Sequence, residues 1–158
     1  MSDPRMKLVL VTPEIPYNTG AIGRTCVALD LELILIKPYG FSLDEKAVIR
    51  AGTRYWQHVQ LSQYDSWQSF LGDRKPPRES LYFFEEHGAQ SVYDPDYQHD
   101  AYLVFGCESK GLPAEILDDM TDRVFIYVPI LMFVNIYIQR KLFRSDGDVQ
   151  KQENREKL

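Results

Sequence analysis

Residues 105–113 constrain the possible fold more than any other segment of the chain. They read Phe-Gly-Cys-Glu-Ser-Lys-Gly-Leu-Pro and follow an apolar run, 101–105, that is rich in β-forming residues and predicts a buried strand of a parallel sheet. Gly106 and Gly111 permit a tight turn and the close approach of a ligand, and Pro113 suits the first turn of a helix. Ligands of open α/β sheets bind at the carboxyl ends of strands, so the segment predicts a loop for a nucleotide-like cofactor. An ordinary strand-to-helix connection explains this segment, taken alone, equally well.

Segments typical of strands and helices alternate along the rest of the chain. Apolar, β-branched or aromatic runs predict strands over 7–11, 31–36, 59–61, 81–84, 101–105 and 124–128. Helices are expected through residues 26–29, over 44–50 with Gly52 beyond the end, over 66–71, and from Pro113 onward. This order predicts an α/β fold in which helices flank a parallel sheet.

Composition predicts one compact domain. With 158 residues, 44% of them hydrophobic, the chain can bury a real core, and we expect a single domain over 1–143. The polar stretch 144–158 is expected to be a disordered tail. No run reaches the length of a membrane span, and the two cysteines and three histidines make neither a disulfide framework nor a zinc pattern. A reducing cytoplasm, or an organelle matrix of similar redox state, is the expected location.

A second motif follows the first predicted strand. Residues 13–24 read Pro-Glu-Ile-Pro-Tyr-Asn-Thr-Gly-Ala-Ile-Gly-Arg, and this motif together with 105–113 resembles the SPOUT-class RNA 2′-O-ribose methyltransferases. The subfamily that it resembles most methylates the wobble nucleotide, cytidine or uridine, of tRNA. The resemblance extends from Met6 to about Ile130 and includes 37–41 and 50–56. Other nucleotide-binding α/β proteins are disfavoured because no Gly-x-Gly-x-x-Gly turn follows the first strand and no Walker motif is present.

The resemblance implies a fold, a cofactor and partners. It implies a deep trefoil knot in the C-terminal half, a homodimer with active sites at the interface, S-adenosylmethionine as methyl donor and tRNA as substrate. No membrane and no metal take part. The cofactor would lie among three loops, held by backbone groups and by apolar walls. The residues implied are Phe84, Gly106, Glu108, Gly111, Leu112, Val128 and Ile130. Buried core is the alternative for the side chains of Phe84, Val128 and Ile130.

Asn18 and Arg24 match the substrate and catalytic motif of the family. The reaction is an in-line attack of the ribose 2′-hydroxyl on the sulfonium methyl, in which alignment supplies much of the acceleration. A guanidinium with a pKa above about 12 is a poor base. We therefore expect Arg24 to grip the neighbouring phosphate and favour the developing alkoxide, and Asn18 to orient the ribose. The proton leaves through water or Glu108. The alternative for Arg24 is a surface arginine paired with a carboxylate.

Any RNA site must be local, because the net charge of −5 argues against broad nonspecific binding of nucleic acid. The candidate cations are Arg24, Lys46, Arg50, Arg54 and Lys110, and the candidate stacking faces are Tyr17, Tyr55 and Trp56. The alternative for the basic series from 46 to 54 is an ordinary solvated helix face.

The C-terminus departs from the family pattern. After Ile130 the family continues with an Arg-Ser-Leu-Asn-Leu-Ser-like loop and an amphipathic helix, whereas this chain continues with the apolar run 131–138. Asn135 does not take the place of the motif asparagine, since its offset from Pro129 is too short and no serine follows. The alternative function is therefore a catalytically impaired module that binds RNA or cofactor without turnover.

Overall fold

A single parallel sheet forms the centre of the protein. The structure is a computed structural model, and it describes residues 5–126. Within these residues the sheet has seven strands in the order β3-β2-β1-β6-β4-β7-β5, and every neighbouring pair is parallel. The strands are β1 (Lys7–Val11), β2 (Glu32–Ile36), β3 (Gln60–Tyr64), β4 (Leu81–Glu85), β5 (Gln90–Ser91), β6 (Tyr102–Phe105) and β7 (Val124–Ile126). The predicted α/β class with a parallel sheet is confirmed.

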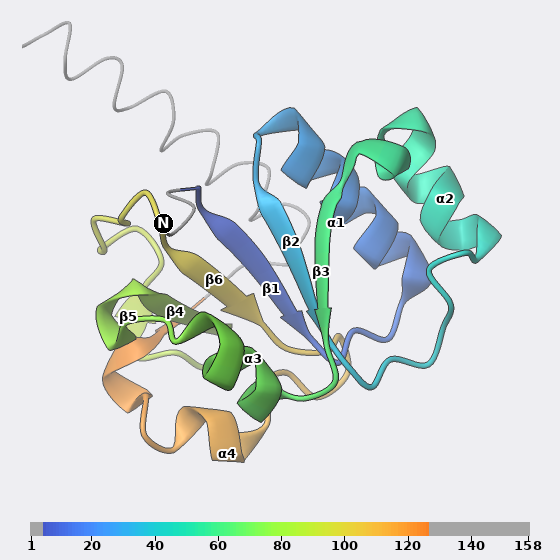
Figure 1. The fold of residues 1–158 in the computed structure, drawn as a ribbon. Helices are drawn as coiled ribbons and strands as arrows, with labels where there is room; N and C mark the ends of the chain where they lie inside the picture. Colours follow the sequence, from blue (N-terminus) through green and yellow to red (C-terminus); the bar gives the residue numbers. More distant parts are fainter. Residues whose placement is uncertain (1–4, 127–158) are drawn as a thin grey trace, which may run out of the picture.

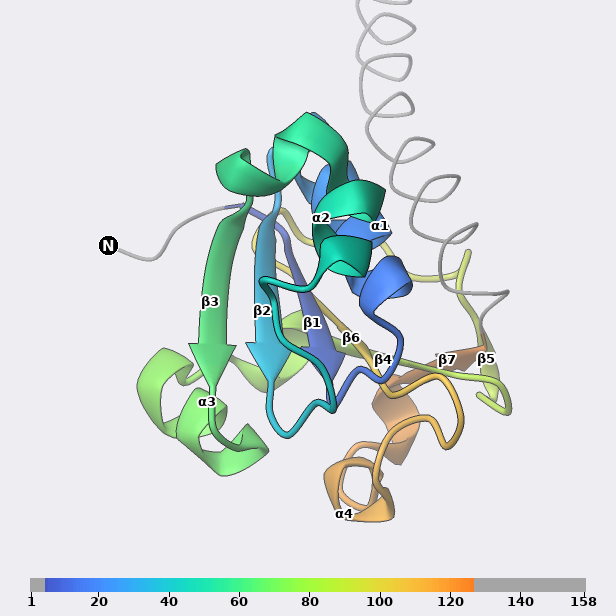
Figure 2. The ribbon, with the colours of Figure 1, turned by 90° about the vertical axis from the view of Figure 1, so that its right-hand side faces the viewer.

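Helices cover both faces of the sheet, as Figures 1 and 2 show. α1 (Pro16–Ala28) and α2 (Lys46–Gly52) lie on one face, and α3 (Trp67–Arg74) and α4 (Ala114–Leu117) lie on the other. Short 3-10 turns complete the described chain: η1 (Thr53–His58), η2 (Arg78–Ser80) and η3 (Thr121–Arg123).

Alternate residues of the central strands pack into two separate hydrophobic cores, one on each face of the sheet. Leu8 and Leu10 of β1 point into one cluster, to which α1 contributes Ile22 and Cys26. The second cluster lies across the sheet and includes Val9, Val11, Phe70 of α3 and Ile116 of α4. Because successive side chains of a strand point to opposite faces, a strand buried on both faces is mostly apolar, and the buried charged residues Lys7 and Glu32 stand at the first positions of β1 and β2.

Glycines allow α1 to approach α2 closely. A Cβ atom on Gly20 would lie 2.3 Å from the carbonyl oxygen of Val48, and one on Gly23 would lie 2.6 Å from the ring of Trp56. Side chains at these two positions would therefore push α1 away from α2 and from η1.

The main differences between the observed elements and the sequence prediction are at α1, α2 and β5. α1 begins at Pro16, so Asn18 lies in its first turn rather than before it, and Arg24 lies well inside the helix. α2 begins at Lys46 and includes Gly52, which was expected to lie beyond its end. The two-residue strand β5 was not predicted because so short a segment carries no periodicity. The expected knot, residues 127 and 128 of the last predicted strand, and the polar tail lie outside the described residues.

Candidate active site at the carboxyl edge of the sheet

Two loops from neighbouring strands meet at the carboxyl edge of the sheet. β1 and β6 pair in register, with Leu10 opposite Phe105, so the segments that follow them, 12–18 and 106–113, leave the sheet side by side. Figure 1 shows the chain leaving both strands at the arrowhead end of the sheet. The sequence prediction of a ligand loop at the carboxyl edge agrees with this position.

Glu108 links the two loops. Its carboxylate accepts hydrogen bonds from the backbone N–H groups of Glu14 (2.8 Å) and Ile15 (3.2 Å), and from the side-chain amide of Asn18 (3.4 Å). The first two contacts supply the N-terminal cap of α1, since Ile15 itself provides no side-chain cap and Pro16 has no N–H. A carboxylate at this end also interacts favourably with the helix dipole. The structure thus brings together Asn18 and Glu108, two of the predicted catalytic residues.

Glu14 makes the reciprocal contact, which sequence reasoning missed. Its carboxylate accepts hydrogen bonds from the backbone N–H of Ser109 (3.0 Å) and from the Ser109 hydroxyl (2.7 Å). The Ser109 hydroxyl is the main cause that holds the pKa of the Glu14 carboxyl below its ordinary value of 4.5. Each glutamate therefore fixes the backbone of the other loop.

The predicted cofactor loop is closed at its base by its own backbone. Cys107 and Gly111 exchange two N–H···O=C bonds of 3.2 and 3.0 Å, and Gly111 has φ +69°, a conformation that favours glycine. A Cβ atom on Gly106 would lie 2.0 Å from the carbonyl carbon of Gly111. Position 106 therefore needs glycine for the turn itself. A valine at this position would therefore displace the turn.

Glu85, at the end of β4, also belongs to this edge, although no sequence pattern predicted its contact. Its carboxylate accepts a hydrogen bond from the backbone N–H of Leu112. The preceding residue, Phe84, is fully buried and stacks on Phe105 with ring centres 4.9 Å apart. The Phe84 side chain thus belongs to the core. Val128 and Ile130, the remaining predicted cofactor residues, lie outside the described residues.

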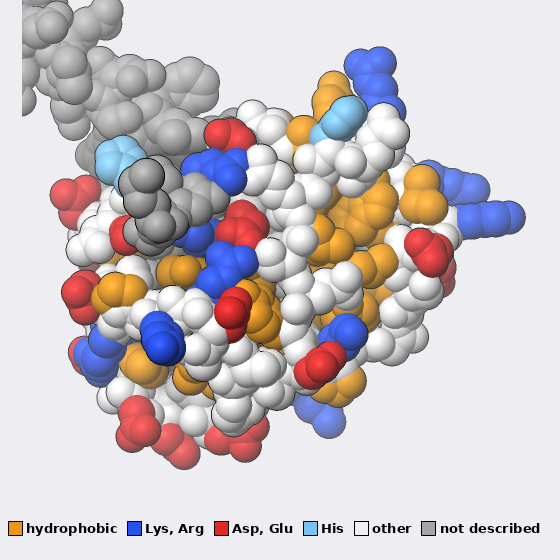
Figure 3. Space-filling view, in the orientation of Figure 1, with side chains coloured by type: hydrophobic (Ala, Val, Ile, Leu, Met, Phe, Trp, Pro, Cys, Tyr) orange, Lys and Arg blue, Asp and Glu red, His pale blue; other side chains and the backbone are white. Residues whose placement is uncertain are grey.

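Predicted RNA-binding cations gather along α1, α2 and η1. The guanidinium carbons of Arg24 and Arg54 lie 5.9 and 5.4 Å from the ring centre of Tyr55, so both cations flank one aromatic ring. Lys46 and Arg50 are exposed one turn apart on α2. In Figure 3, Lys and Arg side chains project where Figure 1 places α2.

The other candidates for RNA contact differ in exposure. Lys110 is exposed at the tip of the loop 106–113, and Tyr17 is 57% exposed. Trp56 packs against the core, and its ring lies against Gly23, so α1 covers part of the predicted stacking face. Within residues 5–126 Arg24 forms no ion pair with a carboxylate.

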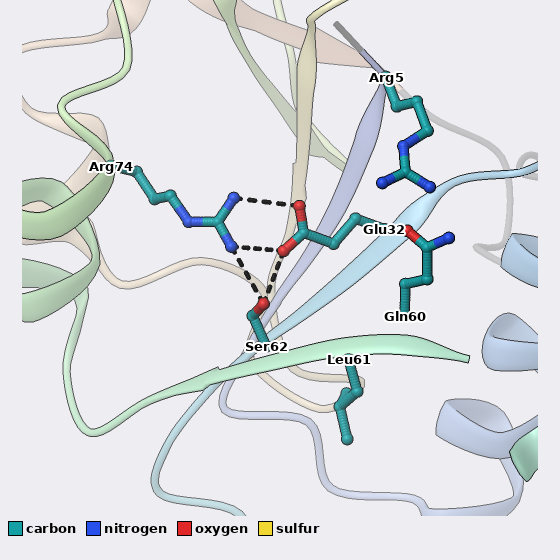
Figure 4. A pocket seen from close by; sticks show the side chains of 6 residues that line it. All are labelled: Arg5, Glu32, Gln60, Leu61, Ser62 and Arg74. Atoms are coloured by element: carbon teal, nitrogen blue, oxygen red, sulfur yellow. Dashed lines mark hydrogen bonds and ion pairs between the residues drawn. The ribbon is translucent and has the colours of Figure 1, made fainter. Parts of the chain in front are cut away.

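A shallow cavity of about 320 Å³ lies elsewhere, near the amino ends of β2 and β3. Figure 4 shows three of its polar side chains paired with one another: Arg74 donates to both carboxylate oxygens of Glu32, and Ser62 donates to Glu32 at 2.6 Å. The residues lining it are Arg5, Glu32, Gln60, Leu61, Ser62 and Arg74. These contacts join α3 to the sheet, so we interpret this network as structural.

Neither a metal site nor a membrane helix is found in the described part of the chain. Residues 5–126 contain no cluster of three or more His, Cys, Asp or Glu side chains arranged to hold a metal ion. The same range contains no helix long and apolar enough to span a membrane.

Known proteins share this fold and are similar to this chain in sequence. A structure solved for insights into the 2-OH methylation of C/U34 on tRNA superposes with a TM-score of 0.77 and 36% identity, covering 89% of this chain and 99% of that one. The tRNA (cytidine(34)-2′-O)-methyltransferase of Polaromonas sp. is 38% identical over 123 residues, 78% of this chain and 75% of the relative. The enzyme of the same name from Acidovorax sp. is 35% identical, over 78% of this chain and 76% of the relative.

The fold and these relatives identify the class of the protein: it is an α/β methyltransferase of the SPOUT type. The model of the SpoU rRNA methylase family matches residues 5–133, and the chain belongs to that family. The resemblance read from the two sequence motifs is thereby confirmed.

Proposed function

We propose that this protein transfers a methyl group from S-adenosylmethionine to the ribose 2′-hydroxyl of the wobble nucleotide, cytidine or uridine, of a tRNA. The observation that carries the proposal is the linked pair of loops at the carboxyl edge, where Glu108 holds both the amino end of α1 and the amide of Asn18. Relatives that carry the name of this activity share 35 to 38% of their aligned residues with this chain.

The residues of this edge suit an adenosine-bearing cofactor. The turn from Gly106 to Leu112 offers backbone groups, and Leu112, buried to 6% exposure, offers an apolar surface beside them. Adenine binding in a pocket needs both kinds of contact. When bound, S-adenosylmethionine supplies an electrophilic methyl group on a sulfonium sulfur. Phe84, Gly106, Glu108, Gly111, Leu112, Val128 and Ile130 remain the proposed cofactor residues.

The proposed catalytic roles follow from charge and position. Arg24 binds the phosphate next to the target ribose and favours the developing alkoxide, because a guanidinium stays charged at every working pH. Asn18 orients the ribose with its amide. Glu108 already accepts three hydrogen bonds, so it acts first as the group that holds Asn18, and the proton leaves through water or through this carboxylate.

We further propose that two copies of the chain form a homodimer with tRNA bound across both, in the cytoplasm. Exposed apolar side chains next to the site support a contact surface there: Ile15 is 43% exposed and Tyr17 is 57% exposed. Lys46, Arg50, Arg54 and Lys110 would add phosphate contacts to that of Arg24, giving a local cationic surface on a protein of net charge −5. Residues 1–143 are proposed to form the single domain.

The test is a radiolabelled methyl-transfer assay of the full chain on unmodified bulk tRNA, with nuclease mapping of the labelled nucleotide. We expect label at the wobble ribose. Cofactor binding without incorporation would instead favour the module without turnover.

Arg24→Lys keeps the charge but loses the planar fork, so we expect turnover to fall at least about tenfold with little change in stability. Arg78→Lys is the matched control, since Arg78 is an exposed arginine paired with Asp122 on another part of the surface. Equal turnover in the parent and in Arg24→Lys would remove Arg24 from the mechanism.

A further inference from the structure

The two loops of the site are tied by crossed contacts between residues far apart in sequence. The Glu108 carboxylate reaches from the β6 loop to the backbone of Glu14 and Ile15, and the Glu14 carboxylate reaches back to Ser109. Each contact spans more than 90 residues of sequence. We call the four residues Glu14, Ile15, Glu108 and Ser109 the loop clamp.

We propose that Glu14 is a positioning residue for methyl transfer: through Ser109 it holds the tip of the β6 loop, and it thereby fixes Glu108 and the Asn18 amide. This inference rests on the proposed function, in which Asn18 orients the target ribose. Glu14 itself contacts neither Asn18 nor Arg24 within the described residues, so it acts through the clamp.

The hydrogen bonds that the Glu14 carboxylate accepts from Ser109 are charge-assisted and therefore strong. A carboxylate that accepts from a hydroxyl at 2.7 Å and from a backbone N–H at 3.0 Å makes two charge-assisted hydrogen bonds. The lowered pKa of the Glu14 carboxyl agrees with this geometry, because both Ser109 contacts favour the ionised form. Glu14 is therefore charged, and its bonds are intact, at neutral pH.

Only the tip of the β6 loop depends on Glu14. The base of the loop is closed by the paired backbone groups of Cys107 and Gly111, and the next residue, Leu112, is held by Glu85. Loss of the Glu14 carboxylate would release Ser109, which adjoins Glu108 at the tip, and would leave the base of the loop in place. A displacement of about 1 Å at a reacting group can cost about a hundredfold in rate. The expected effect is therefore on the chemical step, with little effect on cofactor affinity or folding.

The experiment compares Glu14→Ala, Glu14→Gln and Ser109→Ala with the parent, using the full chain and bulk tRNA. Glu14→Ala should lower kcat at least about tenfold, while KM for tRNA and the Kd of S-adenosylmethionine change less than about threefold. Glu14→Gln should recover most of the lost kcat, since its carbonyl oxygen still accepts the Ser109 N–H. Ser109→Ala removes only the hydroxyl arm and should fall between these two.

Glu115→Ala is the matched control. Glu115 is an exposed glutamate of α4, and within residues 5–126 its side chain makes no hydrogen bond or ion pair. Its kcat should equal that of the parent. The melting temperature of every variant should lie within about 4 °C of the parent, since only exposed contacts are lost.

Hydrogen exchange separates failure of this inference from failure of the proposed function. The Ile15 N–H is held by Glu108, so it should exchange faster in Glu14→Ala and in Ser109→Ala, whether or not the chain methylates tRNA. A parent without methyl transfer contradicts the proposed function, and the exchange of Ile15 then decides whether the clamp exists.

Two results would overturn the inference. One is unchanged kcat in Glu14→Ala with unchanged exchange at Ile15. The other is a joint fall of kcat, cofactor affinity and melting temperature without recovery in Glu14→Gln, which would make Glu14 a structural residue.

Discussion

Two glutamates at opposite ends of the sheet each accept three hydrogen bonds, yet they are built differently. Glu32 starts β2 at the amino edge, where its side chain is 10% exposed and is paired with the guanidinium of Arg74 and the hydroxyl of Ser62. Glu108 lies at the carboxyl edge, exposed, and its partners are two backbone N–H groups and one amide. One carboxylate is paired with a cation, and the other is bound by neutral N–H groups at the start of a helix.

The difference between the partners of Glu32 and those of Glu108 indicates what each edge of the sheet contributes to the protein. At the amino edge the charges are matched and shielded, which joins α3 to β2 and β3 and leaves little for a ligand to bind. At the carboxyl edge the Glu108 side chain joins a loop to the start of a helix, beside exposed polar groups. We therefore expect substitutions at the amino edge to change stability and those at the carboxyl edge to change activity.

The largest effect is expected at Glu32. Glu32→Ala leaves the partly buried guanidinium of Arg74 without its carboxylate, and we expect the free energy of unfolding to fall by about 3 kcal/mol. Urea denaturation measures the change. Glu108→Ala is the paired variant: it loses exposed contacts, so its stability should fall by only about 1 kcal/mol while methyl transfer is lost. An equal loss of stability in both variants would break the comparison.

A smaller change in stability is expected when the pH is lowered, through protonation of Glu32. Burial acts to raise the pKa of Glu32, but the hydrogen bonds from Arg74 and Ser62 outweigh it and lower the pKa below 4.5. A lowered pKa in the folded state means that the contribution of Glu32 to stability is complete above about pH 4.5 and is lost as the pH falls through the folded-state pKa.

Melting temperatures of the parent and of Glu32→Gln between pH 7 and pH 3 test this point. The parent should lose more stability over that range than the variant, and the gap between them should narrow only below about pH 4.5. The Glu14 and Asp122 carboxyls also have lowered pKa values, and the subtraction removes their common contribution. A gap that stays constant to pH 3 would contradict the assignment.

The smallest effect is expected at Thr19, next to Asn18 in α1. Its side chain is fully buried, and within residues 5–126 its hydroxyl has no hydrogen-bond partner. Thr19→Val should raise the free energy of unfolding by about 1 kcal/mol, because a buried polar group without a partner is replaced by a methyl group of similar shape.

Thr25→Val is the control on the same helix. The Thr25 hydroxyl donates to the carbonyl of Ala21 at 3.3 Å, so this variant should lose stability rather than gain it. Chemical denaturation of both variants gives the comparison. Loss of stability in Thr19→Val would show that its hydroxyl finds a partner in solution.

Much of the fold could be predicted from local patterns. The strands β1, β2, β4 and β6 follow apolar runs whose residues are buried on both faces, and such runs read clearly in a sequence. The boundaries of the elements were harder to predict. A helix was expected through residues 26–29, whereas α1 already begins at Pro16. Pro at the first helical position was the available signal.

The site was predictable only in part. The two motifs supplied Asn18, Arg24 and Glu108, and the structure places Asn18 against Glu108 and Arg24 against Tyr55. The contacts of Glu14 and Glu85 at this edge were missed, since neither a glutamate in a loop nor one at the end of a strand has a local feature that reveals its partner. Whether Gly106 serves a ligand or its own turn could likewise not be read from its neighbours in sequence.

By itself the sequence determined the α/β class, the parallel sheet and the family, because burial on two faces, glycine turns and two spaced motifs are local properties of the chain. The tertiary structure decided the strand order, which brings β1 beside β6, and hence the crossed contacts of Glu14 with Ser109 and of Glu108 with the start of α1. It also decided that Glu32 pairs with Arg74 across 42 residues. Such pairings depend on which segments fold side by side, and a hydrogen bond of about 3 Å requires a geometry that only the assembled sheet provides.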